Sequence, residues 1–200
     1  MFKTIIFFLL LVSFQLRSEV NVLAISGSLR NDSLNTKLVT EAAKMASAQG
    51  ARVVIFSLKK NPLPFYDGDL EDSEGMPVSA SRLREFFLSS DLVMISSPNY
   101  NGSMSGVLKN ALDWVSRSEK KDYGKEPFQG KKFLLMCASP GKTGGAKGLC
   151  HLRECLQSLR ANVVSEQFVL PLANSKFDEN GRLNDPQVAR QLYELVRKSL

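Results

Sequence analysis

Four polar side chains suited to binding a phosphate group fall within eight positions near the start of this chain. The segment SGSLRNDSLN carries them, as Ser28, Arg30, Ser33 and Asn35. It follows an apolar run and precedes a segment with helical spacing, and the free N–H groups and the dipole at the start of a helix attract an anion. A guanidinium adds a forked cation that matches a phosphate group. A turn with only Asp32 or Ser33 as helix cap would need fewer such groups, so we predict a phosphate-binding loop.

A second polar loop, SPNYNGS, follows the apolar run LVMIS. Its candidate binding residues are Pro98, Asn99, Tyr100, Asn101 and Gly102. The proline directs the chain away from the strand, and the asparagines and the glycine tolerate unusual backbone dihedral angles. By itself the tyrosine would be a surface aromatic anchor in a turn. Next to a phosphate-binding loop, we instead predict that it lies beside a flat ring whose carbonyl groups bond backbone N–H groups.

A third loop, SPGKTGGAKG, is rich in glycine. It contains a Gly-Lys-Thr triplet, but a nucleotide-binding P-loop also needs a glycine five residues earlier, where this chain has Met136. The Gly-x-Gly-x-x-Gly pattern of dinucleotide-binding loops is absent from the first loop as well. We therefore predict that the third loop brings its backbone close to a flat ligand. Its candidate binding residues are Ser139, Gly141, Gly144 and Gly145.

The elements that must position these loops are strands alternating with helices. Apolar runs predict strands at 20–26, 51–58, 91–97, 131–139 and 161–170. Helical spacing predicts helices at 33–50, 79–90, 103–118, 146–160 and 184–200. The Pro- and Gly-rich segment 59–77 is expected to be a long loop. This pattern predicts an α/β fold, a doubly wound five-stranded parallel sheet with helices on both faces.

The three polar loops follow the first, third and fourth predicted strands. Ligands of open parallel sheets bind outside the carboxyl ends of the strands, at the switch point. The loops are therefore expected to converge on one site that holds a phosphate group and a flavin-like ring.

Composition and single residues exclude several other classes of protein. The chain has 200 residues, 44% of them hydrophobic, and a net charge of +6 whose cations are scattered, so we do not expect nucleic acid as a partner. His151 is the only histidine, and we expect it on a helix surface. We expect Cys137, Cys150 and Cys155 to be buried free thiols in a reducing compartment, in preference to a disulfide or a metal site.

Residues 1–18 form an apolar extension ahead of a predicted domain at 19–200. The extension resembles a short signal peptide, and its apolar run is shorter than the roughly 20 residues of a membrane span. It is equally consistent with a start codon placed too far upstream. The expected location is cytoplasmic, and export or membrane tethering through residues 1–18 is the alternative.

Four segments give the chain a resemblance to the NADPH-dependent FMN reductase family, which includes quinone, chromate and azo-dye reductases. They are VLAISGSLRNDSLN, LPFYDGDLE, ISSPNYNGSMSGVLKNALDW and ASPGKTGG, within residues 20–146. The chain departs from the family in its apolar extension, in Asn99 where many relatives carry glutamate, and in the Lys142–Thr143 pair. The resemblance implies a flavodoxin-like fold.

The resemblance also implies a noncovalently bound FMN, with NADPH or NADH as electron donor. Ser28, Arg30, Ser33 and Asn35 would hold the FMN phosphate, the 98–102 loop would flank the ring, and the glycine-rich loop would close the other side. Hydride would pass to flavin N5 and then, in a ping-pong scheme, to a quinone-, azo- or flavin-type acceptor, so no protein residue is expected to be catalytic. Metal oxyanions are a further possible class of acceptor.

Members of this family form homodimers or homotetramers in which partner residues complete the pocket. The candidates for that contact are Trp114, Arg117 and the loop 59–78. Packing within the chain is an equally good explanation of Trp114, and plain solvation of Arg117.

Two other classes of function remain open at this point. A flavodoxin-like electron carrier without its own NAD(P)H activity is the first, although the basic charge of this chain is unlike the acidic flavodoxins. A flavin-free interaction domain is the second.

Overall fold

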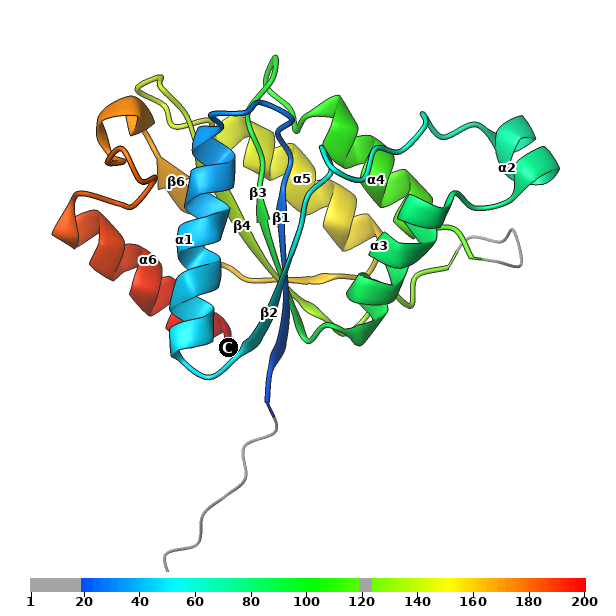
Figure 1. Ribbon diagram of the computed structural model, residues 1–200, viewed down its shortest axis with the longest axis horizontal. Coiled ribbons are helices and arrows are strands. Elements are labelled where there is room, and N and C mark those ends of the chain that lie inside the picture. The colour runs from blue at the N-terminus through cyan, green and yellow to red at the C-terminus, as the bar shows by residue number, and fades with distance from the viewer. Residues whose placement is uncertain (1–18, 119–123) are drawn as a thin grey trace, which may run out of the picture.

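A parallel sheet forms the centre of the computed structural model, which describes residues 19–118 and 124–200 (Figure 1). The predicted extension at 1–18 lies outside the described residues. The strands are β1 (Asn21–Ser26), β2 (Arg52–Phe56), β3 (Leu92–Ser96), β4 (Lys132–Ala138), β5 (Asn162–Val163) and β6 (Phe168–Leu170). Their order is β2-β1-β3-β4-β5, and β6 also pairs with β4. All these pairings are parallel, as predicted.

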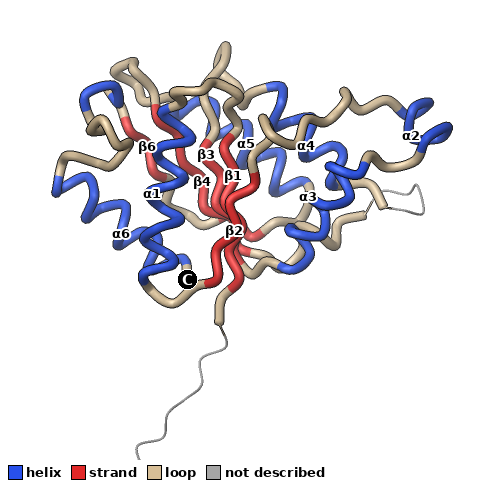
Figure 2. The backbone as a smooth tube through the Cα atoms, viewed as in Figure 1, coloured by secondary structure: helices blue, strands red, loops and turns tan. Residues whose placement is uncertain are grey.

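Helices cover both faces of the sheet (Figure 2). They are α1 (Leu34–Ala48), α2 (Gly68–Glu74), α3 (Val78–Ser89), α4 (Gly106–Val115), α5 (Ala146–Ser158) and α6 (Pro186–Ser199), with a short 3-10 helix, η1 (Ala173–Ser175). The helices α1 and α6 pack on one face, and α3, α4 and α5 pack on the other. Within the described ranges, no helix is both long enough and apolar enough to span a membrane.

The continuous apolar runs of the strands follow from this two-sided burial. In β1, Val22 and Ala24 belong to the core under α1 and α6, whereas Leu23 and Ile25 belong to the core under α3, α4 and α5. Successive side chains of a strand point to opposite faces, so a strand buried on both sides needs an apolar residue at every position. The doubly wound fold predicted from these runs is confirmed.

The predicted fifth strand, 161–170, is interrupted in the structure. Only its two ends, β5 and β6, pair with β4. From the end of β5 onward, the guanidinium of Arg153, on α5, donates to the carbonyl oxygens of Val163, Val164 and Ser165 at 3.4, 2.7 and 3.1 Å. These carbonyl groups therefore bond a side chain of the covering helix, which the apolar pattern of the strand does not indicate.

The segment predicted as a loop at 59–77 contains the helix α2. Asp67 caps this helix, since its carboxylate accepts from the N–H of Asp69 at 2.9 Å. The helix α4 begins at Gly106 and not at residue 103, because the preceding residues form a tight turn. The cap of α6 is Asp185, followed by Pro186, as the sequence indicates.

Candidate functional site

The loops that follow β1, β3 and β4 meet at one edge of the sheet, as predicted (Figure 1). They enclose a pocket of about 440 Å³. Eight of the predicted site residues line it: Ser28, Arg30, Ser33, Asn35, Pro98, Asn99, Tyr100 and Ser139. Five other predicted residues do not: Asn101, Gly102, Gly141, Gly144 and Gly145. Five lining residues were not predicted: Asp32, Leu34, Ala138, Pro140 and Asn174.

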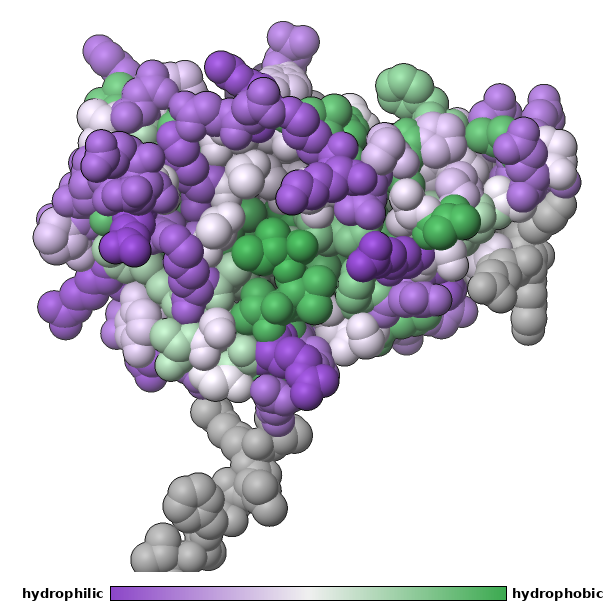
Figure 3. Space-filling view, viewed as in Figure 1, coloured by the Kyte–Doolittle hydropathy of each residue, from purple (hydrophilic) through white to green (hydrophobic). Residues whose placement is uncertain are grey.

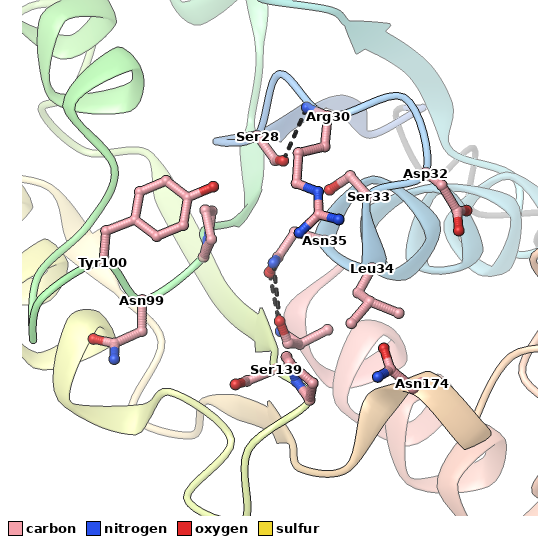
Figure 4. A pocket seen from close by; sticks show the side chains of 13 residues that line it. Ser28, Arg30, Asp32, Ser33, Leu34, Asn35, Asn99, Tyr100, Ser139 and Asn174 are labelled. Atoms are coloured by element: carbon pink, nitrogen blue, oxygen red, sulfur yellow. Dashed lines mark hydrogen bonds between the residues drawn. The ribbon is translucent and has the colours of Figure 1, made fainter.

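The end of the pocket beside α1 is rich in hydrogen-bond donors. Ser33 caps α1, accepting from the N–H of Thr36 at 3.2 Å, and Ser28 Oγ accepts from the N–H of Arg30 at 3.3 Å. Both hydroxyl groups act as acceptors in these bonds, which leaves their O–H groups able to donate to a ligand. Figure 4 shows the Arg30 side chain beside Ser33 and Asn35. Among the described residues it has no acidic partner, so this end of the pocket attracts an anion.

Asp32 is the one carboxylate that lines this pocket. It lies 2.5 Å from the ammonium group of Lys37, one turn into α1. The ion pair offsets the negative charge at the pocket rim, and the side chain of Asp32 is largely exposed. The carboxylate therefore does not cancel the positive potential of Arg30 and the helix terminus.

Asn35 lines the pocket, but its amide is used within the protein. The side chain is 4% exposed. Its Nδ2 donates to the carbonyl oxygen of Ala138 at 2.9 Å, and its Oδ1 accepts from the N–H of Ala138 and from Ser96 Oγ, both at 2.9 Å (Figure 4). The amide thus joins α1 to the ends of β3 and β4. The sequence predicts a phosphate ligand at this position, and the structure shows that the same side chain holds the loops together.

The loop after β3 folds into a two-residue hairpin. The backbones of Tyr100 and Ser103 exchange both hydrogen bonds, at 2.9 and 3.0 Å, and φ is 53° at Asn101 and 84° at Gly102. Two central residues with positive φ are the signature of a type I′ turn, for which Asn-Gly is the favoured sequence. Asn101 and Gly102 therefore make the turn and do not flank the pocket. The turn projects Tyr100, which is half-exposed, over the pocket mouth.

Asn99 is anchored beneath this hairpin. Its N–H donates to the thiol of Cys137, and its Oδ1 is buried without a hydrogen-bond partner in the described part of the chain. The hairpin approaches α5 so closely that a Cβ at Gly148 would lie 2.8 Å from Asn99 Oδ1 and 3.0 Å from the carbonyl oxygen of Ser103. Gly148, which the sequence analysis missed, is needed for this contact.

The three cysteines differ in their environments. Burial raises the pKa of Cys137 to about 11, even though the N–H of Asn99 stabilises its thiolate, so the thiol stays protonated at neutral pH. Burial also raises the pKa of Cys155. Cys150 is exposed on α5 and Cys155 is only partly buried, so of the three predicted buried thiols only Cys137 is confirmed as buried.

The glycines of the third loop serve packing within the chain. Gly144 and Gly145 have φ of 64° and 84°. A Cβ at Gly144 would collide with Val169, and one at Gly145 would lie 2.5 Å from Cys137 Sγ and 2.9 Å from the Cβ of Asn99. The close neighbours of Gly144 and Gly145 are thus β6, β4 and the hairpin, and the approach of a ligand to their backbone stays a prediction.

Asn174 reaches the pocket from η1, close to the C-terminal end of the sheet. Figure 4 shows its amide directed toward the pocket. The segment is placed by backbone bonds, since the N–H of Ala173 donates to the carbonyl oxygen of Ser139 at 2.9 Å and the N–H of Leu172 donates to that of Gly141 at 3.2 Å. No local pattern announces this contact, because it depends on the return of the chain after β6.

Two of the three candidates for a subunit contact are turned into the chain itself. Trp114 is fully buried, and its Nε1 donates to the carbonyl oxygen of Pro64 at 2.8 Å. Arg117 Nε lies 3.0 and 2.9 Å from the two carboxylate oxygens of Glu71, a residue of α2 that is 3% exposed. Trp114 and Arg117 therefore hold the 64–71 segment of their own chain, which is the packing alternative for Trp114 and an ion pair in place of plain solvation for Arg117. Within the 59–78 segment, Phe65 and Val78 are the most exposed apolar residues, at 82% and 85%.

The strand order and the position of the pocket define the class of protein. An open parallel sheet with the order 2-1-3-4-5, and a pocket of phosphate-binding character at the switch point between β1 and β3, is the flavodoxin-like arrangement.

The family model of NADPH-dependent FMN reductases matches residues 20–175, and the chain belongs to this family. It is 34% identical to an NAD(P)H-dependent FMN reductase of Pseudomonas aeruginosa over 183 residues, which cover 91% of this chain and 94% of that protein. It is also 34% identical to a quinone reductase of Escherichia coli K12 over 161 residues, which cover 80% and 82% of the two chains.

The solved structure of FerB, a flavoenzyme NAD(P)H:(acceptor) oxidoreductase of Paracoccus denitrificans, superposes on the model with a TM-score of 0.77. It is 29% identical and covers 90% of this chain and 94% of that chain. The predictions of the family, of the fold and of an oxidoreductase class that uses FMN and NAD(P)H are confirmed.

The bonds of Asn35 generate a first prediction. Replacing Asn35 with leucine leaves the N–H and carbonyl groups of Ala138 without their side-chain partner, so we expect the free energy of unfolding to fall by about 2–4 kcal/mol. Urea denaturation of the flavin-free protein measures this loss. Asn31→Ala, an exposed change in the same loop, serves as the control and should shift stability by no more than about 0.5 kcal/mol. Equal stability of the Asn35→Leu variant and the wild type would contradict the assignment.

Proposed function

We propose that this protein is an NAD(P)H-dependent, FMN-containing oxidoreductase that reduces quinone-, azo- or flavin-type acceptors in a ping-pong scheme. The observation that supports it is the single pocket in which an anion-binding end, with Arg30 and the start of α1, faces an aromatic end with Tyr100. Among the acceptors, quinones have additional support from the similarity to the quinone reductase of Escherichia coli.

The donor set of the pocket fits FMN. A phosphate group needs several donors at one point, and the hydroxyl groups of Ser28 and Ser33, the guanidinium of Arg30 and the first N–H groups of α1 supply them. Asn174 adds a neutral amide on the opposite wall, within reach of a polar chain between phosphate and ring. The residues that remain to hold the ring are Pro98, Asn99, Tyr100 and Ser139.

In this proposal the protein binds and orients FMN, the electron donor and the acceptor, and the bound FMN carries out the chemistry. FMN supplies the two-electron chemistry, accepting hydride from the nicotinamide and delivering it to the acceptor. The titratable side chains that line the pocket are Arg30, Asp32 and Tyr100, and the only carboxylate among them is paired with Lys37. The pocket thus has the groups for positioning two ligands in turn, and no carboxylate pair for acid–base catalysis.

We further propose that the protein is a homodimer or homotetramer with Phe65 at a subunit contact. Phe65 is 82% exposed on a segment that is held rigidly against α4. Pro64 accepts from Asn110 Nδ2 and Trp114 Nε1 at 2.8 Å each, and the N–H of Tyr66 donates to Asn110 Oδ1 at 2.8 Å. An exposed aromatic residue on a fixed segment loses little entropy on binding, which is typical of the residues that dominate interfaces.

A second apolar surface supports association. Figure 3 shows apolar side chains gathered over β2, between α1 and α3. This strand is at the edge of the sheet, and Ile55 on it is 49% exposed. Exposed apolar edges of this kind are commonly covered by another chain.

The visible spectrum of the purified full-length protein tests the proposed function. We expect the bands of oxidised flavin. We also expect them to bleach when NADPH or NADH is added without oxygen, because the bound FMN is then reduced by the donor. Bands that persist with both donors would instead indicate an electron carrier. A protein that stays colourless after addition of FMN would overturn the assignment of the pocket.

The anion-binding role of Arg30 gives a further prediction. Arg30→Ala removes a charge-assisted hydrogen bond to the phosphate group, so we expect the Kd for FMN to rise about 10- to 100-fold, as measured by fluorescence titration. Arg30→Lys keeps the positive charge but not the forked guanidinium, so its Kd for FMN should lie between those of the wild type and Arg30→Ala. Arg190→Ala, on the exposed surface of α6, is the control. FMN content equal to wild type in Arg30→Ala after gel filtration would count against the assignment.

The exposure of Phe65 leads to a prediction for the oligomeric state. Phe65→Asp places a charge in the proposed contact, so we expect sedimentation velocity to show a smaller assembly, monomers from a dimer or dimers from a tetramer. Tyr193→Asp, a comparably drastic change on α6 far from α2, should leave the assembly intact (Figure 1). A monomeric wild type, or a Phe65→Asp variant that assembles as the wild type does, would refute this contact.

A further inference from the structure

A second cavity lies directly beside the proposed FMN pocket. It has a volume of about 400 Å³ and opens between the loop that follows β1 and the first turn of α4. We call this cavity the lateral pocket, and its walls are formed chiefly by Leu29, Tyr100, Gly106 and Val107. Arg30 and Tyr100 line both cavities, so the two share a wall.

The base of the lateral pocket is fixed by Ser105, the cap of α4. Its hydroxyl donates to the carbonyl oxygen of Gly27 at 2.5 Å and accepts from the N–H of Leu108 at 3.3 Å. A Cβ on Gly27 would lie 3.1 Å from Ser105 Oγ, so the loop and the helix are in close contact at this point. Above it they diverge, and a Cβ on Gly106 would meet no atom within 4 Å. The missing side chain of Gly106 is therefore part of the open space.

The walls of the lateral pocket are apolar. Leu29 is 46% exposed and Val107 is partly exposed, and the ring of Tyr100 forms the side toward the FMN pocket. Both hydrogen bonds of the Ser105 hydroxyl are made within the chain. Apart from the shared residues Arg30 and Tyr100, the lining therefore offers no polar side chain that calls for a polar ligand.

We propose that the lateral pocket binds an apolar substituent, a short alkyl chain, of the quinone-type acceptor while the ring of the acceptor lies against the FMN ring at the mouth of the neighbouring pocket. The inference rests on the proposed function. The wall that the two cavities share supports the inference, because a molecule that lies beside Tyr100 can extend past the tyrosine into the lateral pocket. The predicted consequence is a preference for alkylated over unsubstituted quinones, with binding strengthened about fourfold for each methylene group that becomes buried.

Steady-state kinetics of the flavin-loaded, full-length protein test this preference. The measured quantity is the ratio of kcat/KM for propyl-benzoquinone to that for benzoquinone, with NADPH as donor. We expect a ratio of roughly 60 for the wild type when all three carbons of the propyl chain are buried. We expect Gly106→Leu, whose side chain occupies the part of the cavity beside the start of α4, to bring the ratio close to 1. Gly106 begins α4 with an ordinary φ, and leucine is the better helix former, so this variant is expected to fold.

Leu29→Ser is a second variant, which removes an apolar wall and leaves the space open. It should lower the same ratio about threefold, whereas Val78→Ser, at an apolar and more exposed site on α3, should not change it. FMN content is measured for every variant, so that a loss of cofactor is not mistaken for a loss of selectivity.

Calorimetric titration with 4-alkylphenols, which are not reduced, gives a readout without turnover. The Kd of the flavin-loaded wild type should fall along the series from phenol to 4-propylphenol, and Gly106→Leu should abolish this trend. If the wild type is reduced by NADPH but shows the same ratio and the same trend as Gly106→Leu, the lateral pocket has no such role.

Two other outcomes are distinguishable from that one. If Gly106→Leu changes the oligomeric state in sedimentation velocity, the cavity is occupied by a second copy of the chain, and the assignment to the acceptor is overturned. If the wild type binds no FMN or is not reduced by NADPH or NADH, the proposed function itself fails, and the inference fails with it.

Discussion

The amide of Asn35 is the contact on which the geometry of the site depends. It bonds both the N–H and the carbonyl group of Ala138, and it accepts from Ser96, so that one side chain joins the start of α1 to the ends of β3 and β4. These bonds span 103 and 61 residues of sequence. They fix the separation between the anion-binding loop and the two loops opposite before any ligand arrives. A cofactor that enters such a pre-formed pocket does not have to order the loops that bind it.

Hydrogen bonds within the protein also determine which polar groups of the pocket can still bond a ligand. Asn101 and Gly102 are used in a turn, Ser105 caps α4, and Gly144 and Gly145 allow close packing against Val169 and Cys137. Once these groups are accounted for, the hydroxyl groups of Ser28 and Ser33 and the guanidinium of Arg30 remain as donors near the start of α1. Asn174 lies on the opposite wall, and Asn99, Tyr100 and Ser139 line the other end. The asymmetry of the pocket, with donors at one end and Tyr100 at the other, therefore follows from the bonds that build the loops.

The sequence was sufficient to predict the sheet, the helices on both faces and the convergence of three loops. Strands buried on both sides are continuously apolar, and parallel strands place the loops that follow them at one edge. The roles of individual residues were harder to predict. Asn35 has the chemistry of a phosphate ligand, and only its distance from Ala138 in the fold shows that the amide is already bonded. Asn174 and Gly148 matter through contacts with segments far away in the chain, and Arg153 interrupts the fifth strand by bonding its carbonyl groups. Such long-range contacts have no local signal.

The two adjoining cavities suggest how one small domain can hold a fixed cofactor and a variable acceptor. Binding of a phosphate group is directional, and the first cavity provides directed donors on a helix terminus and a rigid loop. Burial of an alkyl group is non-directional, and the second cavity provides apolar walls and an empty position at Gly106. Tyr100 stands between them on the tip of a tight hairpin, where its position is set by the backbone of Asn101 and Gly102. The Asn101–Gly102 turn, which the sequence predicts as a ligand contact, thus contributes indirectly, because it positions the tyrosine that lines both cavities.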